Sequence, residues 1–288
     1  MNVKDMLRQA SDAAKQLITL SDQTIIGILK ETAQVLRTHT EEVLAANRQD
    51  LERMDPANPK YDRLKLTEER LQGIAADMEN VSTLPSPLNK VLSETTRPNG
   101  MVIRKVTVPF GVIGVIYEAR PNVTSDAAAL CLKAGSAVIL RGGKEAINSN
   151  LAVSEIMRNA VESVGFPKDC IALVKDTSRQ SATELMQLSD YLDVLIPRGG
   201  AGLIRSVVEN AKVPVIETGV GNCHIYVDES ADVQMAAKII FNAKTSRPSV
   251  CNAIETILVH KNIAQKALPE IKKLLDTKNV EIRGCETC

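Results

Sequence analysis

The chain has 288 residues, enough for one large domain or two ordinary ones with a sizeable core. Its 35 Lys and Arg balance its 35 Asp and Glu, so no overall field favours a nucleic acid or a membrane surface as partner. With no Trp, three Phe and four Tyr, the chain also lacks the aromatic platforms on which nucleic-acid bases stack.

The first eighty residues predict helices. Segments 3–20 and 22–54 carry apolar residues at three- and four-residue spacing with few breakers, and another helix is expected to begin at Thr67. No apolar run is typical of a signal peptide or a membrane span. The cytoplasm is therefore the expected location, and free thiols are expected for the six cysteines.

From residue 99 onward, strands alternate with helices. Asn99-Gly100 is a strong turn signal between extended segments, and it predicts a β-hairpin near residues 99–117. Helices expected near 124–134, 147–164, 180–188, 202–211, 233–243 and 263–275 alternate with strands at 136–141, 170–174, 191–197, 224–228 and 255–260. This order predicts an α/β fold, a mostly parallel sheet with helices on its faces. The glycine-rich "ETGVGN" favours two domains, 1–225 and 226–288.

Polar, glycine-containing segments directly follow two of the predicted strands. In parallel sheets ligands bind beyond the carboxyl ends of strands, and a helix N-terminus favours phosphate. Plain strand-to-helix turns are the alternative, and the G-x-G-x-x-G fingerprint is incomplete. Two such loops with arginine favour a nucleotide or another phosphate ligand. The candidates are Arg141, Gly142, Gly143 and Lys144 in one loop, and Arg198, Gly199 and Gly200 in the other.

Two further residues stand at junctions between elements. Asn122 follows a strand and opens a helix, so it is either an N-cap or an oxyanion donor, and the spacing leaves both open. Cys251 stands between a basic loop and a strand. It is either a structural thiol or a nucleophile, and the nearby Lys244 and Arg247 favour the thiolate. None of the three histidines is placed like a metal ligand.

Four long segments together carry a family resemblance: "VPFGVIGVIYEARPNVTSDAAALCLKAGSAVILRGGKEAINSN", "IPRGGAGLI", "VPVIETGVGNCHIYVD" and "NAKTSRPSVCNAIETILVH". They resemble the glutamate-5-semialdehyde dehydrogenases, or γ-glutamyl phosphate reductases, of the aldehyde dehydrogenase superfamily. The resemblance implies that residues 1–225 bind the nucleotide, that the hairpin near 99–117 belongs to an oligomerisation element, and that 226–288 begin the thiol-bearing domain. Family members run beyond "VEIRGCETC", so the C-terminal part of the family's chain is expected to be absent, which predicts reduced activity and uncovered apolar surface.

The implied activity is the NADPH-dependent reduction of L-glutamyl 5-phosphate to L-glutamate 5-semialdehyde in proline biosynthesis. Cys251 attacks the carbonyl and phosphate leaves, a nicotinamide reduces the thioester, and the product cyclises without help. Asn122 and the Cys251 amide are the implied oxyanion donors. The resemblance also implies a homo-oligomer, and the instability of the acyl phosphate favours direct transfer from a glutamate 5-kinase.

The same resemblance assigns the remaining candidates. The cations of the 141–144 loop suit a ribose 2′-phosphate, so NADP(H) is the expected cofactor. Glu217 falls where hydrolytic relatives keep a general base, and here it is expected to line the cofactor cleft. Arg120 and Arg247 either clamp the substrate's carboxylate or phosphate, or form ion pairs that hold their loops.

Two rival functions remain open at this point. A hydrolytic aldehyde dehydrogenase would use Glu217 to activate water and would turn over without phosphate. An inert scaffold, or a catalytically inert fragment of a bifunctional pyrroline-5-carboxylate synthase, would carry a Cys251 thiol that reacts slowly.

Overall fold

The computed structural model describes residues 2–58, 60–118, 120–219 and 221–286. Its contacts divide the chain into two compact units, Met1–Thr218 and Gly219–Cys288, and each is described by itself. None of the described helices is long and apolar enough to cross a membrane.

The first unit begins with helices, as predicted: α1 (Val3–Leu17), α2 (Asp22–Thr38), α3 (Thr40–Leu51), α4 (Tyr61–Leu64) and α5 (Glu68–Thr83). The single helix expected over 22–54 is wrong, because the chain breaks at His39. The hydroxyl of Thr38 donates to the carbonyl of Val35, and that of Thr40 donates to the carbonyl of Arg37. Such side-chain bonds to nearby carbonyls compete with the helical hydrogen bonds and favour an interruption.

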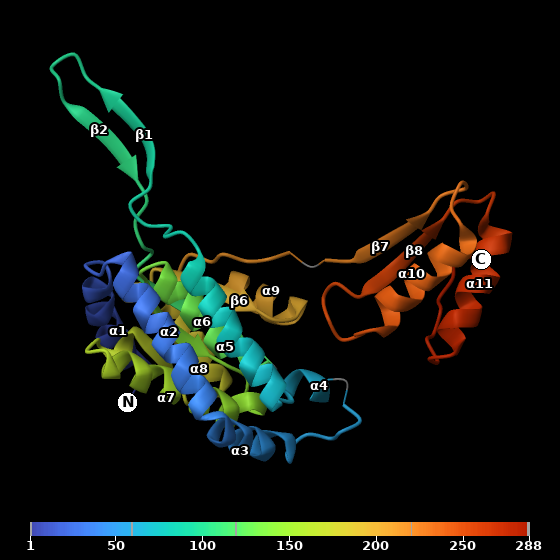
Figure 1. The fold of residues 1–288 in the computed structure, drawn as a ribbon, viewed down its shortest axis with the longest axis horizontal. Coiled ribbons are helices and arrows are strands. Elements are labelled where there is room, and N and C mark those ends of the chain that lie inside the picture. Colours follow the sequence, from blue (N-terminus) through green and yellow to red (C-terminus); the bar gives the residue numbers. More distant parts are fainter. Residues whose placement is uncertain (1, 59, 119, 220, 287–288) are drawn as a thin grey trace. The chain divides into compact units, whose positions relative to one another are not determined.

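A β-hairpin follows, but at other residues than predicted. β1 (Val91–Thr96) pairs antiparallel with β2 (Val102–Val106), and every residue of both strands is exposed. The turn predicted at Asn99-Gly100 lies between β1 and β2, but the predicted bounds 99–117 are wrong, since residues 112–117 join the central sheet instead. β1 has no buried face, so it carries no alternating apolar pattern by which the sequence could reveal it. Figure 1 shows the hairpin extending away from the helices of its own unit.

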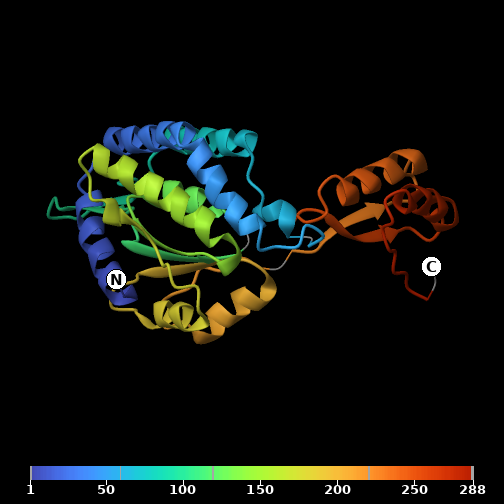
Figure 2. The ribbon, with the colours of Figure 1, turned by 90° about the horizontal axis from the view of Figure 1, so that it is seen from below.

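The centre of the first unit is a parallel sheet of β3 (Val112–Tyr117), β4 (Ala137–Arg141), β5 (Ile171–Leu173) and β6 (Val194–Arg198), in the order β5-β4-β3-β6. All of β3 is buried. Helices α6 (Asn122–Lys133) and α7 (Ile147–Ser163) pack against one face, with α2 and α5 outside them, and α8 (Arg179–Gln187) and α9 (Ala201–Asn210) lie on the other side (Figure 2). The predicted α/β class is confirmed.

The strand order reverses beside β3. The chain runs outward from β3 through α6 (Asn122–Lys133) to β4 and β5, and then returns to place β6 on the other side of β3. A parallel bridge between Leu195 and Val215 adds one more extended segment next to β6. Such a reversal is the position at which open parallel sheets bind ligands, beyond the carboxyl ends of the strands.

The second unit is smaller. Its parallel strands β7 (Cys223–Val227) and β8 (Ile254–Val259) are packed with α10 (Val233–Thr245) and α11 (Ala264–Asp276). The register shifts between Cys223 and His224, which is the position of a β-bulge. Ile240 of α10 and Ile271 of α11 are buried in its core.

Candidate functional site

The carboxyl ends of β3, β4 and β6 bring three of the predicted loops to one edge of the first unit's sheet. Ile116 is paired with Arg141, and Tyr117 with Arg198, so the segments that follow these strands begin at the same level. Glu217 is exposed and lies two residues after the Leu195–Val215 bridge, at the same end of the sheet. The sequence-predicted residues of the first unit thus meet at one edge.

Arg141 holds the loop that follows β5. Its guanidinium donates to the carbonyls of Thr177 and Ser178, both at 2.7 Å, and to the carbonyl of Gly142 at 3.2 Å. Burial lowers the pKa of Arg141, and its Nε is buried with no partner among the described residues. Lys144 is exposed, and in the described part of the chain no hydrogen bond or ion pair involves it.

Gly142 is a point of close approach. A Cβ at this position would lie 2.2 Å from Nδ2 of Asn150 and 3.2 Å from the ring of Tyr117. Asn150 Oδ1 accepts a hydrogen bond from Thr124 at 3.0 Å, and the hydroxyls of Thr124 and Tyr117 are 2.6 Å apart. Burial raises the pKa of the Tyr117 hydroxyl. This buried network joins the ends of β3, α6 and α7 beneath the loop.

Asp50 of α3 holds the start of α7, the helix that follows this loop. Its carboxylate accepts hydrogen bonds from the backbone N–H groups of Asn148 at 3.1 Å and Ser149 at 2.8 Å, and from the Ser149 hydroxyl at 2.7 Å. It is 1% exposed and caps the N-terminus of α7. The sequence analysis missed Asp50, because only the fold brings residue 50 to residues 148 and 149.

Glu118 spans the position where the strand order reverses. It follows β3, and its Oε1 accepts a hydrogen bond at 2.7 Å from the backbone N–H of Gly200 at the start of α9. A Cβ at Gly199 would lie 2.4 Å from the same oxygen. The glycines of the second predicted loop therefore admit a carboxylate at a helix N-terminus, where anions are favoured.

Asn122 is the first residue of α6, and Pro121 is the N-cap, so the N-cap alternative for Asn122 is wrong. Its Nδ2 donates to Oδ2 of Asp126, one turn further along the helix, at 2.9 Å. Burial raises the pKa of Asp126 to about 6, the hydrogen bond from Asn122 lowers it, and the charge of Asp77 on α5 raises it. An amide nitrogen carries two hydrogens, and this bond uses one of them.

Cys251 lies in the second unit, in a turn between α10 and β8. Its side chain is exposed, and its backbone carbonyl accepts a hydrogen bond from the Cys223 thiol at 3.5 Å. Lys244 does not extend into solvent but donates to the carbonyl of Ile254 at 3.0 Å, which ties the end of α10 to β8. Arg247 is exposed four residues before Cys251.

The described thiols fall into two groups. Cys131 and Cys170 are buried, which raises the pKa of each to about 12. Cys223, Cys251 and Cys285 have at least partial access to solvent, and Cys288 lies outside the described residues. No group of three or more His, Cys, Asp or Glu among the described residues is placed to hold a metal ion.

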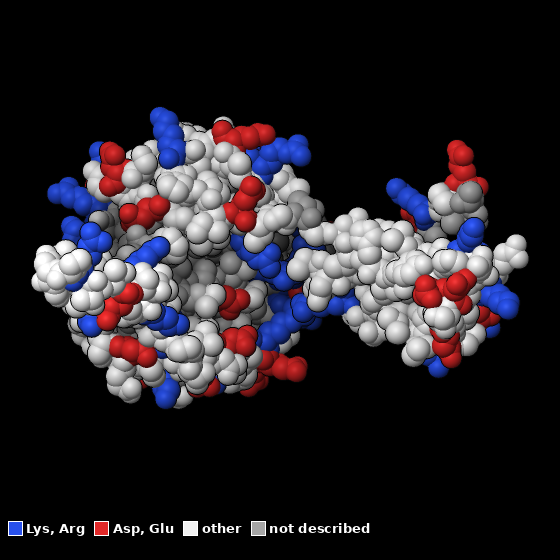
Figure 3. Space-filling model, turned by 90° about the horizontal axis from the view of Figure 1, so that it is seen from above, with Lys and Arg blue, Asp and Glu red and all other residues white. Residues whose placement is uncertain are grey.

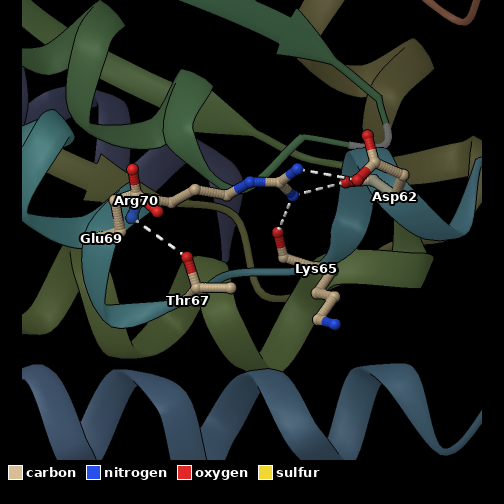
Figure 4. Close-up of a pocket in the computed structure, with 5 residues that line it drawn as sticks. All are labelled: Asp62, Lys65, Thr67, Glu69 and Arg70. Carbon is tan, nitrogen blue, oxygen red and sulfur yellow. Dashed lines mark hydrogen bonds and ion pairs between the residues drawn. The ribbon is translucent and has the colours of Figure 1, made fainter. Parts of the chain in front are cut away.

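A hollow of about 490 Å³ beside α4 and α5 offers no comparable chemistry (Figure 4). The guanidinium of Arg70 crosses it and donates to the backbone carbonyl and the carboxylate of Asp62, each at 2.7 Å. Thr67 caps α5 by accepting from the backbone N–H of Arg70 at 3.2 Å. These contacts hold the α4–α5 connection.

The family model named aldehyde dehydrogenase family matches residues 1–283. The chain belongs to this family. Aldehyde dehydrogenases use a nicotinamide cofactor, and the edge of the first unit's sheet fits a dinucleotide. Buried donors without partners at Arg141 and Asn150 lie next to Gly142, where a side chain cannot be accommodated. The face of the first unit drawn in Figure 3 carries both cationic and anionic side chains.

Curated relatives and solved structures show which members of the family this chain is similar to. The chain is 67% identical to the gamma-glutamyl phosphate reductase of Parabacteroides distasonis over 287 residues, which cover 99% of this chain and 68% of that protein. It is 54% identical to the enzyme of the same name from Carboxydothermus hydrogenoformans, over 99% of this chain and 69% of that one. The crystal structure of gamma-glutamyl phosphate reductase from Thermotoga maritima matches with a TM-score of 0.88 at 40% identity, covering 100% of this chain and 70% of that chain.

Proposed function

We propose that the chain is an NADPH-dependent acyl-phosphate reductase that converts L-glutamyl 5-phosphate to L-glutamate 5-semialdehyde and phosphate in proline biosynthesis. The observation that carries this proposal is the 67% identity, over nearly the whole chain, to a gamma-glutamyl phosphate reductase. The exposed Cys251 and the phosphate-compatible edge of the first unit's sheet are the features that such a reaction needs.

Cys251 is the proposed nucleophile. Its thiolate attacks the γ-carbonyl carbon of the substrate, and the tetrahedral adduct expels phosphate, which leaves a thioester on the sulfur. The second hydrogen of the Asn122 amide and the backbone N–H of Cys251 are the proposed donors to the oxyanion. Removal of one such donor typically lowers kcat by about 10²–10³-fold. Exposure of the Cys251 side chain gives an acyl phosphate direct access to the sulfur.

The loops of residues 141–144 and 198–200 are proposed to hold the dinucleotide, with Glu217 at the same edge. When bound, the cofactor supplies the hydride that reduces the thioester. Lys144 is the proposed partner of a 2′-phosphate, because the Nη atoms of Arg141 already donate to backbone carbonyls. This assignment favours NADP(H) over NAD(H).

Arg120 and Arg247 are proposed to bind the carboxylate or phosphate of the substrate. A guanidinium matches both groups with two parallel hydrogen bonds. Arg120 is half-buried in the segment between Glu118 and Asn122, and Arg247 is exposed in the segment that leads to Cys251. Each therefore stands close in sequence to one of the groups that act on the carbonyl.

We further propose that the hairpin mediates contact between copies of the chain. Every residue of β1 and β2 is exposed, and their large apolar side chains include Val91 (54% exposed), Leu92 (60%) and Ile103 (49%). Apolar surface of this kind, together with open strand edges, is typical of an interface.

The lability of the acyl phosphate also favours direct transfer of the substrate from a glutamate 5-kinase in the cytoplasm.

The deciding experiment follows the reverse reaction, the formation of NADPH from NADP⁺ and pyrroline-5-carboxylate, with and without phosphate. We expect turnover that requires phosphate and that falls by about 10³-fold or more in Cys251→Ala, since loss of a covalent nucleophile costs at least this much in comparable enzymes. Turnover without phosphate would favour hydrolytic chemistry at Glu217 instead. Binding of NADPH to the inactive variant, measured by fluorescence, separates loss of chemistry from loss of folding.

A further inference from the structure

A second thiol lies next to the proposed nucleophile. Cys223 is the first residue of β7, and its sulfur is 3.5 Å from the backbone carbonyl oxygen of Cys251. A carbonyl oxygen lies about 2.4 Å from its own Cα and a cysteine sulfur about 2.8 Å from its own, so the Cα atoms of Cys223 and Cys251 lie within about 9 Å of each other. Disulfides join Cα atoms typically about 5.5–6 Å apart. A disulfide between the two cysteines therefore requires the turn to move by up to about 3 Å.

The backbone around Cys251 permits such a movement. Residues 246–253 lie outside the strand ladder, and their backbone hydrogen bonds include turn bonds from Val250 N to Arg247 O at 3.4 Å and from Ala253 N to Val250 O at 3.2 Å. The register shift after Cys223 falls at the same end of the β7–β8 pair. A segment outside the ladder has no ladder hydrogen bonds to lose when it shifts.

The other described thiols do not share this position. Cys131 and Cys170 are buried in the first unit, where their access to oxidants is poor. Cys285 follows α11 and is exposed, and it lies in neither of the strands that flank the Cys251 turn. Cys223 combines partial exposure with direct contact to the backbone of the reactive residue.

We propose that Cys223 is a resolving thiol, which forms a reversible disulfide with Cys251 when a peroxide oxidises the nucleophile. In the first step the Cys251 thiolate sulfur bonds to one peroxide oxygen, the O–O bond breaks and hydroxide leaves, so that the sulfur becomes a sulfenic acid. In the second step the Cys223 sulfur attacks the Cys251 sulfur, and the S–O bond breaks. The thiol proton leaves with the hydroxyl as water, and a disulfide remains.

This modification would protect the nucleophile. A sulfenic acid that is not captured by a thiol can be oxidised again to a sulfinic acid, which is irreversible for most proteins. A dithiol reductant reverses the disulfide by exchange and restores both thiols, while it is itself oxidised to a cyclic disulfide. The proposal goes beyond the reductase activity and depends on it only in taking Cys251 as a reactive thiolate.

The test treats the 288-residue chain with hydrogen peroxide and follows it by mass spectrometry of the intact protein and of its peptides. We expect a loss of about 2 Da, corresponding to two hydrogens, with one peptide pair that joins Cys223 to Cys251 and is released by dithiothreitol. In Cys223→Ser, Cys251 should instead gain about 32 Da as a sulfinic acid. Cys285→Ser is the matched control, because it removes another exposed thiol of the same unit and should leave the cross-link intact.

A Cys251 that reaches the sulfinic acid equally fast with and without Cys223 overturns the proposal, and so does a cross-link to any other cysteine. Thermal unfolding shows whether Cys223→Ser or Cys223→Ala has lost its fold. The oxidation result is interpreted for a variant whose melting temperature matches that of the unmodified chain. The rate of iodoacetamide labelling at Cys251 separates the two hypotheses. A fast-labelling Cys251 without a cross-link contradicts the resolving role alone, whereas a slow-labelling Cys251 contradicts the nucleophile assignment as well.

Discussion

The loop edge of the first unit and the thiol turn of the second are held by different means. The loop edge of the first unit adjoins a buried network, in which Asp50 of α3 holds the start of α7 and Thr124 of α6 binds Asn150 of α7. The Cys251 turn is held in part by backbone turns and by the amine of Lys244, which donates to the carbonyl of Ile254. A binding edge gains from preorganisation, because fixed groups lose less entropy when a ligand is bound. A nucleophile must instead be reached by its substrate, and a buried turn would exclude it.

The largest effect expected from this contrast concerns Asp50. Asp50→Ala removes the acceptor of several buried donors at the start of α7, and we expect a loss of about 3 kcal/mol in the free energy of unfolding. Urea unfolding measures it, and hydrogen exchange should locate the loss at the amides of Asn148 and Ser149. Lys244→Met is the matched control from the thiol turn, where one hydrogen bond is removed at a cost of about 1 kcal/mol. Equal losses in the free energy of unfolding for Asp50→Ala and Lys244→Met would contradict the difference between the loop edge and the thiol turn.

A second prediction concerns the pH dependence at Asp126. Since burial raises the pKa of this carboxyl from 3.8 to about 6, the folded state binds its proton more tightly than the unfolded state does. The ionised form therefore destabilises the fold above pH 6, and this penalty is relieved as the pH falls from about 6 to about 4. Asp126→Asn, which keeps an acceptor for Asn122, should raise the free energy of unfolding by about 1–3 kcal/mol at pH 8 and by little at pH 4.

Thermal unfolding of Asp126→Asn and of the unmodified chain across this pH range checks the prediction. An unchanged difference between pH 4 and pH 8 would show that the substitution acts through packing and not through the charge. If Asp126→Asn also lowers kcat and leaves KM unchanged, then the Asp126 carboxylate orients the Asn122 amide in addition to destabilising the fold.

The smallest effect is expected at Lys144, which is exposed and holds nothing in place. Lys144→Ala should raise the Kd for NADPH by about fivefold, the loss of roughly 1 kcal/mol from one exposed charge pair, and leave the Kd for NADH unchanged. Titration of cofactor fluorescence at two salt concentrations measures both constants. A parallel weakening of NADPH and NADH would mean that Lys144 contacts a group common to the two dinucleotides.

Much of this architecture could be read from the sequence, because buried strands and amphipathic helices impose their periods on it. β3, β4 and β6 and the glycine loops after β4 and β6 fall where apolar runs and turn residues predict them. β1 could not be found in this way, because a strand exposed on both faces needs no apolar residues at alternate positions.

The residues that support the candidate site could not be predicted from the sequence either. Glu118 and Asp50 act on groups 82 and 98 residues away, and no local pattern distinguishes such a carboxylate from one that faces solvent. Cys223 could be recognised as a thiol, but only the β7–β8 pairing brings it to the carbonyl of Cys251. Local spacing therefore predicts which elements form, whereas these contacts depend on how distant elements pack.

The hydrogen bonds from the start of α7 to Asp50 affect the order in which parts of the chain fold. The contact closes a stretch of 98 residues, and closing so long a stretch costs more entropy than forming a local turn. Local helices can form early, but the start of α7 gains these hydrogen bonds only after α3 has docked against it. On a ribosome this contact therefore forms late, when α3, the hairpin, β3, β4 and α7 have all been synthesised.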